Sequence, residues 1–393
     1  MRDSNKPNRR EVLKGTGIVA TTLALGASPV TGGAYASKNK VSLPKLTSGD
    51  KVIKKFTVPK EWDAHRRNAK SVHNSHSFLD QEGILATGLQ RSGIDHGGKS
   101  GLQITLYVRH DFGNHDDIPE EIDKIPISIN ELEKGAKASL ACGSTDSGNC
   151  VNYDADTYVE GGEYISGATA CCQGTNTYFG EDRLLTAAHL FYDYEDGSCA
   201  SASDVNGTKV SNYCGGDNEC EWIGEVEKCN IEDDWAIIEP YDHTTISSYI
   251  DYVEDKIEVD GVVSEACLQE WESRWKYNRP CLYSMGTTSS KTSGKLKHAN
   301  FALGSSAEGW ITDCVSYQGD GSKDGVYTYC DVGEGDSGGP TWHEEDGLAY
   351  LVNVNCAYHY FKGEVCGGKN VASDSSGIAG YEIENDNLWF EIP

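Results

Sequence analysis

One serine lies in a setting that could make its hydroxyl reactive. Ser337 belongs to the stretch Gly335–Pro340, which reads GDSGGP. A serine hydroxyl is a weak nucleophile at neutral pH until a base removes its proton. Glycines on both sides let the backbone turn tightly and leave room for a substrate carbonyl. The same turn would direct the backbone N–H groups of Gly335 and Ser337 at one point, where they could stabilise an oxyanion.

Two further side chains could form a proton-transfer system with this serine. His189 ends the apolar sequence LTAAH, and Asp234 precedes the strand-like sequence WAII, with Asp233 as the alternative acid. A histidine can act as a general base, and a carboxylate can fix its tautomer. The order is His, Asp, Ser, with separations of 45 residues (189 to 234) and 103 residues (234 to 337).

In these motifs the chain resembles the trypsin-like, chymotrypsin-fold serine proteases, whose signatures are TAAH, D-x-A and GDSGGP in this order. The resemblance covers roughly residues 160–390. It implies an all-β fold of two antiparallel six-stranded β-barrels. It also implies an endopeptidase acting on proteins or peptides, with no cofactor and no metal. The family's acid stands directly before x-Ala, which favours Asp234 over Asp233.

The resemblance extends to specificity. Asp331 lies six residues before Ser337, where an acid lines the specificity pocket of trypsin-like sequences. A carboxylate there would select Arg or Lys before the cleaved bond, and a solvated acid is the equal alternative. Met285–Gly294 is similar to the G-x-T-T-G hairpin of bacterial relatives, and Tyr350–Asn355 is expected to pair with substrate backbone.

Activation follows the same resemblance. Asp336 is usually buried in this family and paired with a positive group, which in trypsin is a new N-terminus of the form IVGG. The nearest sequence here is ISGA at residues 165–168, so an internal arginine is the closer expectation. The candidates are Arg183, Arg274 and Arg279.

Charge is distributed unevenly along the chain. The formal net charge is −27, and the acidic excess lies entirely after residue 141. Such a surface would repel nucleic acid. It suits a protein that must stay hydrated in high salt, where carboxylates are screened, as in haloarchaeal proteins. An ordinary acidic secreted enzyme is the alternative.

The first residues resemble a twin-arginine export signal. Asn8–Lys14 reads NRREVLK, and the apolar stretch Gly17–Ala27 is too short to span a bilayer. Ala34–Ala36 has the small-x-small pattern of a cleavage site. We therefore expect residues 1–36 to be removed and the protein to be secreted, without a membrane anchor and as a monomer.

The remaining chain divides by composition. Residues 37–82 are polar with few strand-like runs, and their histidines His65, His73 and His76 favour a solvated cluster over a metal site. Residues 83–141 predict a small α+β module, with strands near 83–90, 102–109 and 125–130. This module could be an intramolecular propeptide or a permanent accessory domain. Residues 142–162 predict a linker and residues 163–393 the protease domain. The step in charge and cysteine content suggests self-processing near residues 139–165.

All 14 cysteines lie between Cys142 and Cys366. In an exported chain this predicts up to seven disulfides, of which Cys172–Cys199 and Cys330–Cys356 are guesses. A metal site is disfavoured because there is no paired C-x-x-C. The calcium-like sequence at Asp320–Gly325 is expected to be a plain turn, since the twelfth position is not glutamate.

Two other functions remain as alternatives. An α/β-hydrolase would use the G-x-S-x-G part of the same motif, but its Asp and His must follow the serine, and only the 56 residues 338–393 remain. A catalytically silent binding module with a protease fold is the second alternative.

Overall fold

The computed structural model describes residues 39–385 apart from 111–117, 133–136, 139–140, 143–157, 168–171, 179–182, 193–198, 215–219, 253–254, 305–313, 319–320, 359–360 and 366–368. The chain divides into two units, Met1–Asn39 and Lys40–Pro393, and every helix and strand that the structure describes belongs to the second. The predicted export signal, most of the predicted linker and Asp320 lie outside the described residues. Among the described helices, none has the length and apolar character needed to cross a membrane.

The first sheet contains eight antiparallel strands. Their order across the sheet is β12 (Thr177–Tyr178), β13 (Leu184–Thr186), β16 (Trp235–Pro240), β15 (Cys220–Asn230), β14 (Lys209–Cys214), β10 (Tyr164–Gly167), β11 (Cys172–Thr175) and β8 (Ala141–Cys142). β16 begins with four buried residues, and β13 is buried throughout. This burial holds the two strands in place. The candidate site residues His189 and Asp234 lie just after β13 and just before β16.

The second sheet contains a ring of strands. These are β19 (Leu282–Ser284), β20 (Thr292–Gly294), β21 (Leu296–Leu303), β22 (Gly325–Thr328), β28 (Ser375–Ala379), β25 (Leu348–Tyr358) and β24 (Pro340–Glu345). Only Lys295 separates β20 from β21, so these two strands are counted as one. Each strand then pairs with the next one in this order, and β24 pairs with β19 to close the ring. The ring places β24, which follows Ser337, beside β25.

Further strands extend this sheet. β18 (Asp255–Val263) pairs with β25 and with β17 (Thr245–Tyr252), which pairs with β9 (Tyr158–Gly161). A separate small sheet contains β23 (Val332–Gly333), β26 (Phe361–Val365) and β27 (Lys369–Ala372). The helices of this part are η2 (Ala188–Phe191), α3 (Ala202–Val205), α4 (Glu265–Glu272), η3 (Lys276–Asn278) and α5 (Gly380–Asn385). The prediction of a mainly β chain is confirmed, while the division into two six-stranded barrels stays a prediction.

The N-terminal part of the unit is more structured than expected. It contains β1 (Lys40–Ser48), β2 (Lys51–Pro59), α2 (Lys60–Ser75), η1 (Phe78–Asp80), β3 (Ile84–Asp95), β4 (Ser100–Arg109), β5 (Glu121–Ile122) and β6 (Ile125–Leu132). The strands predicted near 83–90, 102–109 and 125–130 are confirmed as β3, β4 and β6. The expectation of few strands between residues 37 and 82 is wrong. β1 and β2 form a hairpin over their whole length, although many of their residues are polar and half-exposed.

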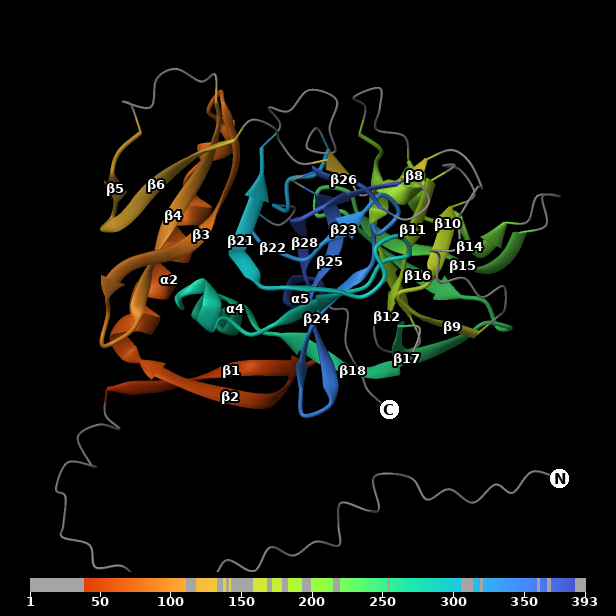
Figure 1. Cartoon of the computed structure of the whole chain (residues 1–393), viewed down its shortest axis with the longest axis horizontal. Coiled ribbons are helices and arrows are strands. Elements are labelled where there is room, and N and C mark those ends of the chain that lie inside the picture. Colours follow the sequence, from red (N-terminus) through yellow and green to blue (C-terminus); the bar gives the residue numbers. More distant parts are fainter. Residues whose placement is uncertain are drawn as a thin grey trace, which may run out of the picture. The chain divides into compact units, whose positions relative to one another are not determined.

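Strand pairing joins this N-terminal part to the second sheet (Figure 1), and buried polar contacts add to this connection. β1 pairs with β18, and β3 pairs with β21. The buried guanidinium of Arg66 in α2 donates to Oε1 of Gln269 in α4 at 2.6 Å. At the end of α2, Nζ of Lys323 donates to the carbonyls of His73 and His76. These contacts make the N-terminal part integral to the unit.

The three histidines of α2 and its end are not a solvated cluster, which corrects the sequence expectation. His73 is fully buried, and its Nε2 lies 2.9 Å from Oγ1 of Thr87. The ring of His65 stacks on that of His96 with 3.8 Å between centroids. Because α2 packs against β4 and β3, these positions lie at an interface inside the unit.

A buried histidine at the junction of β21 and β3 makes stability sensitive to acid. Nδ1 of His298 donates to the carbonyl of Leu89 at 2.9 Å, so Nε2 accepts from the hydroxyl of Tyr107. Burial lowers the pKa of His298 to about 3. The unfolded chain takes up a proton below about pH 6.5, but the folded chain does not. Stability is therefore lost as the pH falls from about 6.5 toward 3, by up to about 1.4 kcal/mol per pH unit.

We expect His298→Gln to remove this contribution. Urea denaturation at pH 7 and pH 5 should show a smaller loss of unfolding free energy in the variant than in the parent. An equal loss in both proteins would contradict the assignment.

Candidate active site

Two strands of the first sheet place His189 and Asp234 side by side. His189 lies in the short helix η2, just after β13, and Asp234 lies in the turn just before β16. β13 and β16 are antiparallel partners with Thr186 opposite Ala236, so the end of one strand meets the start of the other. Residues 45 positions apart (189 to 234) are thus neighbours in space.

The three predicted side chains form a continuous chain of hydrogen bonds. Nδ1 of His189 lies 2.6 Å from Oδ2 of Asp234, and Oδ1 accepts from the backbone N–H of His189 at 2.8 Å. Nε2 of His189 lies 2.8 Å from Oγ of Ser337. An ionised carboxylate only accepts hydrogen bonds, so Nδ1 carries the proton and Nε2 is free to accept from the serine hydroxyl. All three residues are fully buried.

The structure separates Asp234 from its neighbour Asp233. Asp234 has φ +58°, a left-handed conformation uncommon for a residue other than glycine. Its carboxylate thereby faces His189. The carboxylate of Asp233 instead accepts from the side-chain amide of Asn230 at 2.7 Å. The choice of Asp234 from the sequence therefore agrees with the geometry.

The glycines around Ser337 allow its loop to lie between the two sheets. Gly338 has φ +88°, and a Cβ there would lie 2.0 Å from Oγ1 of Thr186. The carbonyl of Ser337 accepts from the N–H of Thr175 in β11 at 2.7 Å. Within the described part of the chain, the N–H groups of Gly335 and Ser337 have no acceptor. They are the donors predicted for an oxyanion.

Asp336 is buried, as expected, but its predicted arginine partner is wrong. Its carboxylate accepts from the N–H groups of Gly333 at 2.6 Å, Thr288 at 2.7 Å and Ser289 at 3.2 Å. Burial raises the pKa of this carboxyl, and the hydrogen bonds oppose that rise. Thr288 and Ser289 belong to the predicted hairpin, so this hairpin supports the nucleophile loop. Backbone donors replace a counter-ion.

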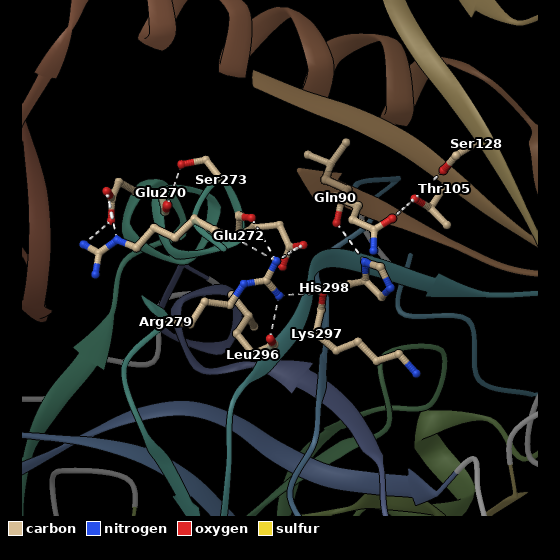
Figure 2. A network of polar contacts seen from close by, with 12 residues as sticks. Gln90, Thr105, Ser128, Glu270, Glu272, Ser273, Arg279, Leu296, Lys297 and His298 are labelled. Carbon is tan, nitrogen blue, oxygen red and sulfur yellow. Dashed lines mark hydrogen bonds and ion pairs between the residues drawn. The ribbon is translucent and has the colours of Figure 1, made fainter. Parts of the chain in front are cut away.

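The three candidate arginines have other partners. Arg183 pairs with Glu227 and Glu239, and Arg274 pairs with Glu270. Arg279 is buried, pairs with the fully buried Glu272 at 3.0 Å, and donates to the carbonyl of Leu296 at 2.7 Å (Figure 2). Burial raises the pKa of Glu272 to about 8, against the opposing effect of Arg279.

We expect Arg279→Leu to destabilise the protein by about 3–5 kcal/mol, because it strands a buried carboxyl without its partner. A matched control is Arg67→Leu, since the Arg67 side chain is 68% exposed and its pair with Asp63 is expected to contribute only about 0–1 kcal/mol. Urea denaturation measures both. Equal losses in the two variants would refute a structural role for the buried pair.

The specificity prediction for Asp331 and the prediction of a substrate-pairing strand have different outcomes. Asp331 is half-buried, and its carbonyl accepts from Oγ1 of Thr292 at 2.8 Å. Its role in specificity stays a prediction. The predicted strand exists as β25, but Ser337 meets a residue beyond the predicted Tyr350–Asn355. Oγ of Ser337 lies 3.3 Å from the carbonyl of Cys356.

Sequence analysis did not place Cys356 in the site, because Cys356 was expected to form a disulfide with Cys330. Cys356 and Cys330 are both free and buried, and Sγ of Cys356 lies 3.6 Å from the carbonyl of Asp234. Cys199 is bonded to Cys314. Both guessed disulfides are therefore wrong. A full set of seven is excluded because five described cysteines are free.

No metal site is assigned. Glu160, Glu163 and Asp251 bring carboxylate oxygens within 4.8 Å of one another. The ammonium of Lys256 pairs with Glu160, and Oγ of Ser247 donates to the same carboxylate at 3.1 Å. The ammonium group of Lys256 therefore already compensates part of the negative charge of these three carboxylates.

Comparisons with known proteins give structural likenesses only. No family model and no curated protein matches the chain. A chymotrypsin from Cellulomonas bogoriensis is 13% identical, with 59% of this chain and 97% of that structure covered and a TM-score of 0.38. Protease A of Thermobifida fusca is 15% identical, with 59% and 97% covered and a TM-score of 0.37. A Nocardiopsis protease is 14% identical, with 59% and 98% covered and a TM-score of 0.38.

Proposed function

We propose that this protein is a serine endopeptidase that cleaves peptide bonds by acyl transfer. The observation that carries the proposal is the chain of hydrogen bonds from Asp234 through His189 to Ser337, with 2.6 Å and 2.8 Å between the bonded atoms. A nucleophile in contact with a base that is oriented by a third group is the arrangement this chemistry requires.

In this mechanism Oγ of Ser337 attacks the carbonyl carbon of the substrate while Nε2 of His189 takes its proton. Asp234 holds the imidazole with Nδ1 protonated and stabilises the imidazolium. The N–H groups of Gly335 and Ser337 bind the oxyanion. His189 then protonates the leaving amine, and water hydrolyses the acyl-enzyme by the same steps. No cofactor takes part.

Asp331 is proposed to favour Arg or Lys before the cleaved bond, on its position six residues before Ser337. Secretion by the twin-arginine route and adaptation to high salt are further proposals, supported by Asn8–Lys14 and by the net charge of −27.

Hydrolysis of fluorescent casein in high salt tests the proposal against a silent binding module. We expect a fluorophosphonate to abolish hydrolysis and EDTA to leave its rate unchanged, because the mechanism uses a serine and no metal. Casein left intact by pure, folded protein would favour the silent module. Loss of activity with EDTA alone would contradict the mechanism.

A further inference from the structure

The turn that carries Asp234 is held in an uncommon conformation. Asp234 has φ +58°, and a residue other than glycine stays in the left-handed region only when its surroundings hold it there. Within the first sheet, the carboxylate of Asp234 is held by its two contacts with His189. The turn itself has a further partner, which comes from a segment much later in the chain.

This partner consists of residues 314–317, which we call the bracing segment. The backbone N–H groups of Ser316 and Tyr317 both donate to the carbonyl of Glu232, at 2.9 Å and 3.0 Å. The hydroxyl of Ser316 also donates to Oε1 of Glu232 at 2.8 Å. Glu232 lies in the same turn as Asp234. The bracing segment therefore holds this turn from outside the first sheet.

Tyr317 is anchored to the second sheet. Its side chain is fully buried, and its ring packs on the backbone of Gly325, where an added Cβ would lie 2.6 Å from ring carbon Cδ2. The carbonyl of Tyr317 accepts from the N–H of Asp324 at 3.2 Å, and its hydroxyl lies 3.3 Å from Oγ of Ser376. Gly325 begins β22 and Ser376 lies in β28, so Tyr317 connects two strands of the ring with the turn of Asp234.

The backbone of Tyr317 is strained in the same way as that of Asp234. Tyr317 has φ +57°, which is unfavourable for a bulky side chain. A left-handed residue lets successive backbone N–H groups converge on one acceptor, as the N–H groups of Ser316 and Tyr317 do on Glu232. Strained residues of this kind cluster at functional sites, where the surrounding structure maintains them.

The other end of the bracing segment is covalently tied. Cys314 forms a disulfide with Cys199, and their Cα atoms are 5.2 Å apart. Cys199 lies shortly before α3, which packs against β15 of the first sheet. The disulfide thus fixes one end of the segment, and the buried side chain of Tyr317 fixes the other.

This bracing bears on the site because the proposed triad joins the two sheets. His189 and Asp234 belong to the first sheet, whereas the loop of Ser337 is held by Thr288, which lies between β19 and β20 of the second. The contact of 2.8 Å between Nε2 of His189 and Oγ of Ser337 connects the two sides. A displacement of about 1 Å at a reacting group can lower a rate about 100-fold. A residue that ties the acid's turn to the second sheet therefore helps to set this contact.

The hydroxyl of Tyr317 does not exchange protons with the triad. Burial is the largest cause that raises the pKa of Tyr317 well above its ordinary value, and the nearby charges of Cys356 and Asp234 add to it. The hydroxyl therefore stays neutral at any working pH. Its contribution is to geometry and not to proton transfer.

We propose that Tyr317 is a positioning residue for the catalytic acid Asp234. Together with the disulfide of the bracing segment, it holds the acid's turn in the conformation that aligns His189 with Ser337. This inference rests on the proposed function and names a residue outside the triad on which the rate of that reaction depends. Tyr317 acts on the reaction only through Asp234.

Casein hydrolysis by Tyr317→Ala tests the inference, with Tyr327→Ala as the matched control. Tyr327 is an equally buried tyrosine of β22 whose hydroxyl donates to Asp374. We expect Tyr317→Ala to lower kcat about 100-fold with KM within a few-fold of the wild type, because the turn of Asp234 does not bind substrate. Tyr327→Ala should keep kcat within a few-fold, and Tyr317→Phe, which retains the ring, should do the same. Folded Tyr317→Ala with an unchanged kcat overturns the inference, and so does an equal loss in Tyr327→Ala.

The same substitution in the Asp234→Asn protein shows whether Tyr317 acts through the acid. Effects of residues that act as a unit are not additive. We therefore expect Tyr317→Ala to change the rate of Asp234→Asn by no more than a few-fold. A further loss of about 100-fold in this background would mean that Tyr317 acts independently of Asp234, which is contrary to the inference.

Replacing both Cys199 and Cys314 by alanine tests the bracing segment without opening the core, since Cys199 is exposed and Cys314 half-buried. We expect kcat to fall about 10-fold if the turn is then aligned in about one molecule in ten, with little further loss in the Asp234→Asn background. This variant decides the matter even where Tyr317→Ala does not fold, because full activity without the disulfide rules out the bracing role. Wild-type protein that neither hydrolyses casein nor reacts with a fluorophosphonate overturns the proposed function as well.

Discussion

Replacing Ser337 by alanine is expected to reduce casein hydrolysis by roughly a million-fold, the loss typical of removing such a nucleophile. The reason is that Oγ of Ser337 is the atom that accepts the acyl group. This oxygen is hydrogen-bonded to Nε2 of His189, with 2.8 Å between the two atoms. The small volume change leaves the fold intact, and the N–H groups that would bind the oxyanion remain. The initial rate of hydrolysis in high salt measures the effect.

Ser203→Ala is the matched control for this variant. Ser203 is exposed, and its hydroxyl bonds to that of Ser201 on the surface. Its replacement should leave the rate unchanged. A Ser337→Ala protein that keeps more than a trace of activity, after contaminating proteases are excluded, would remove Ser337 from the mechanism.

Replacing Asp234 by asparagine is expected to lower the rate about 10⁴-fold. The carboxylate can only accept, and this keeps the proton of His189 on Nδ1. An asparagine amide can donate to Nδ1 instead, which leaves the proton on Nε2, where it cannot receive the serine proton. The initial rate of casein hydrolysis in high salt measures the effect.

Asp233→Asn is the control for this prediction, since Asp233 is the neighbouring acid and its carboxylate faces Asn230. We expect its rates to remain within a few-fold of the wild type. Two variants with equal activity, or a larger loss in Asp233→Asn, would reverse the assignment of the acid.

The local motifs predicted which side chains meet. TAAH and the sequence around Asp234 each tie a reactive residue to the end of a buried strand, and β13 pairs with β16. The glycines of GDSGGP predicted a tight turn around Ser337. Gly338 confirms this, because it has a positive φ and its surroundings leave no room for a Cβ. Each of these features is set within a few residues, so the sequence carries it.

Features that depend on distant pairing were not predictable. The arginine expected for Asp336 is replaced by backbone N–H groups, whose direction depends on how the hairpin at Thr288 packs under the loop. Cys356 contacts Ser337 because of the register of β25, which no local pattern states. The disulfide guesses failed for the same reason, since Cys199 meets Cys314 from 115 residues away.

The N-terminal part illustrates a second limit of sequence reasoning. Residues 37–82 can be polar because β1 and β2 have one buried residue each, Leu46 and Val58, and α2 buries only part of its surface. Sequence analysis interpreted this polarity as a lack of strands. A boundary near residues 139–165 was nevertheless expected from the step in charge and cysteines. Self-processing there stays a prediction, because most of these residues lie outside the described part of the chain.

Mapping the adduct of a fluorophosphonate on the wild-type protein tests most directly whether these three side chains form a working nucleophile. We predict one adduct per molecule, located by peptide mass spectrometry on Ser337, and no adduct in His189→Ala, because the reagent reacts with a serine only when a base activates it. An adduct on any other residue, or none on folded wild-type protein, would contradict the assignment of Ser337 as the nucleophile.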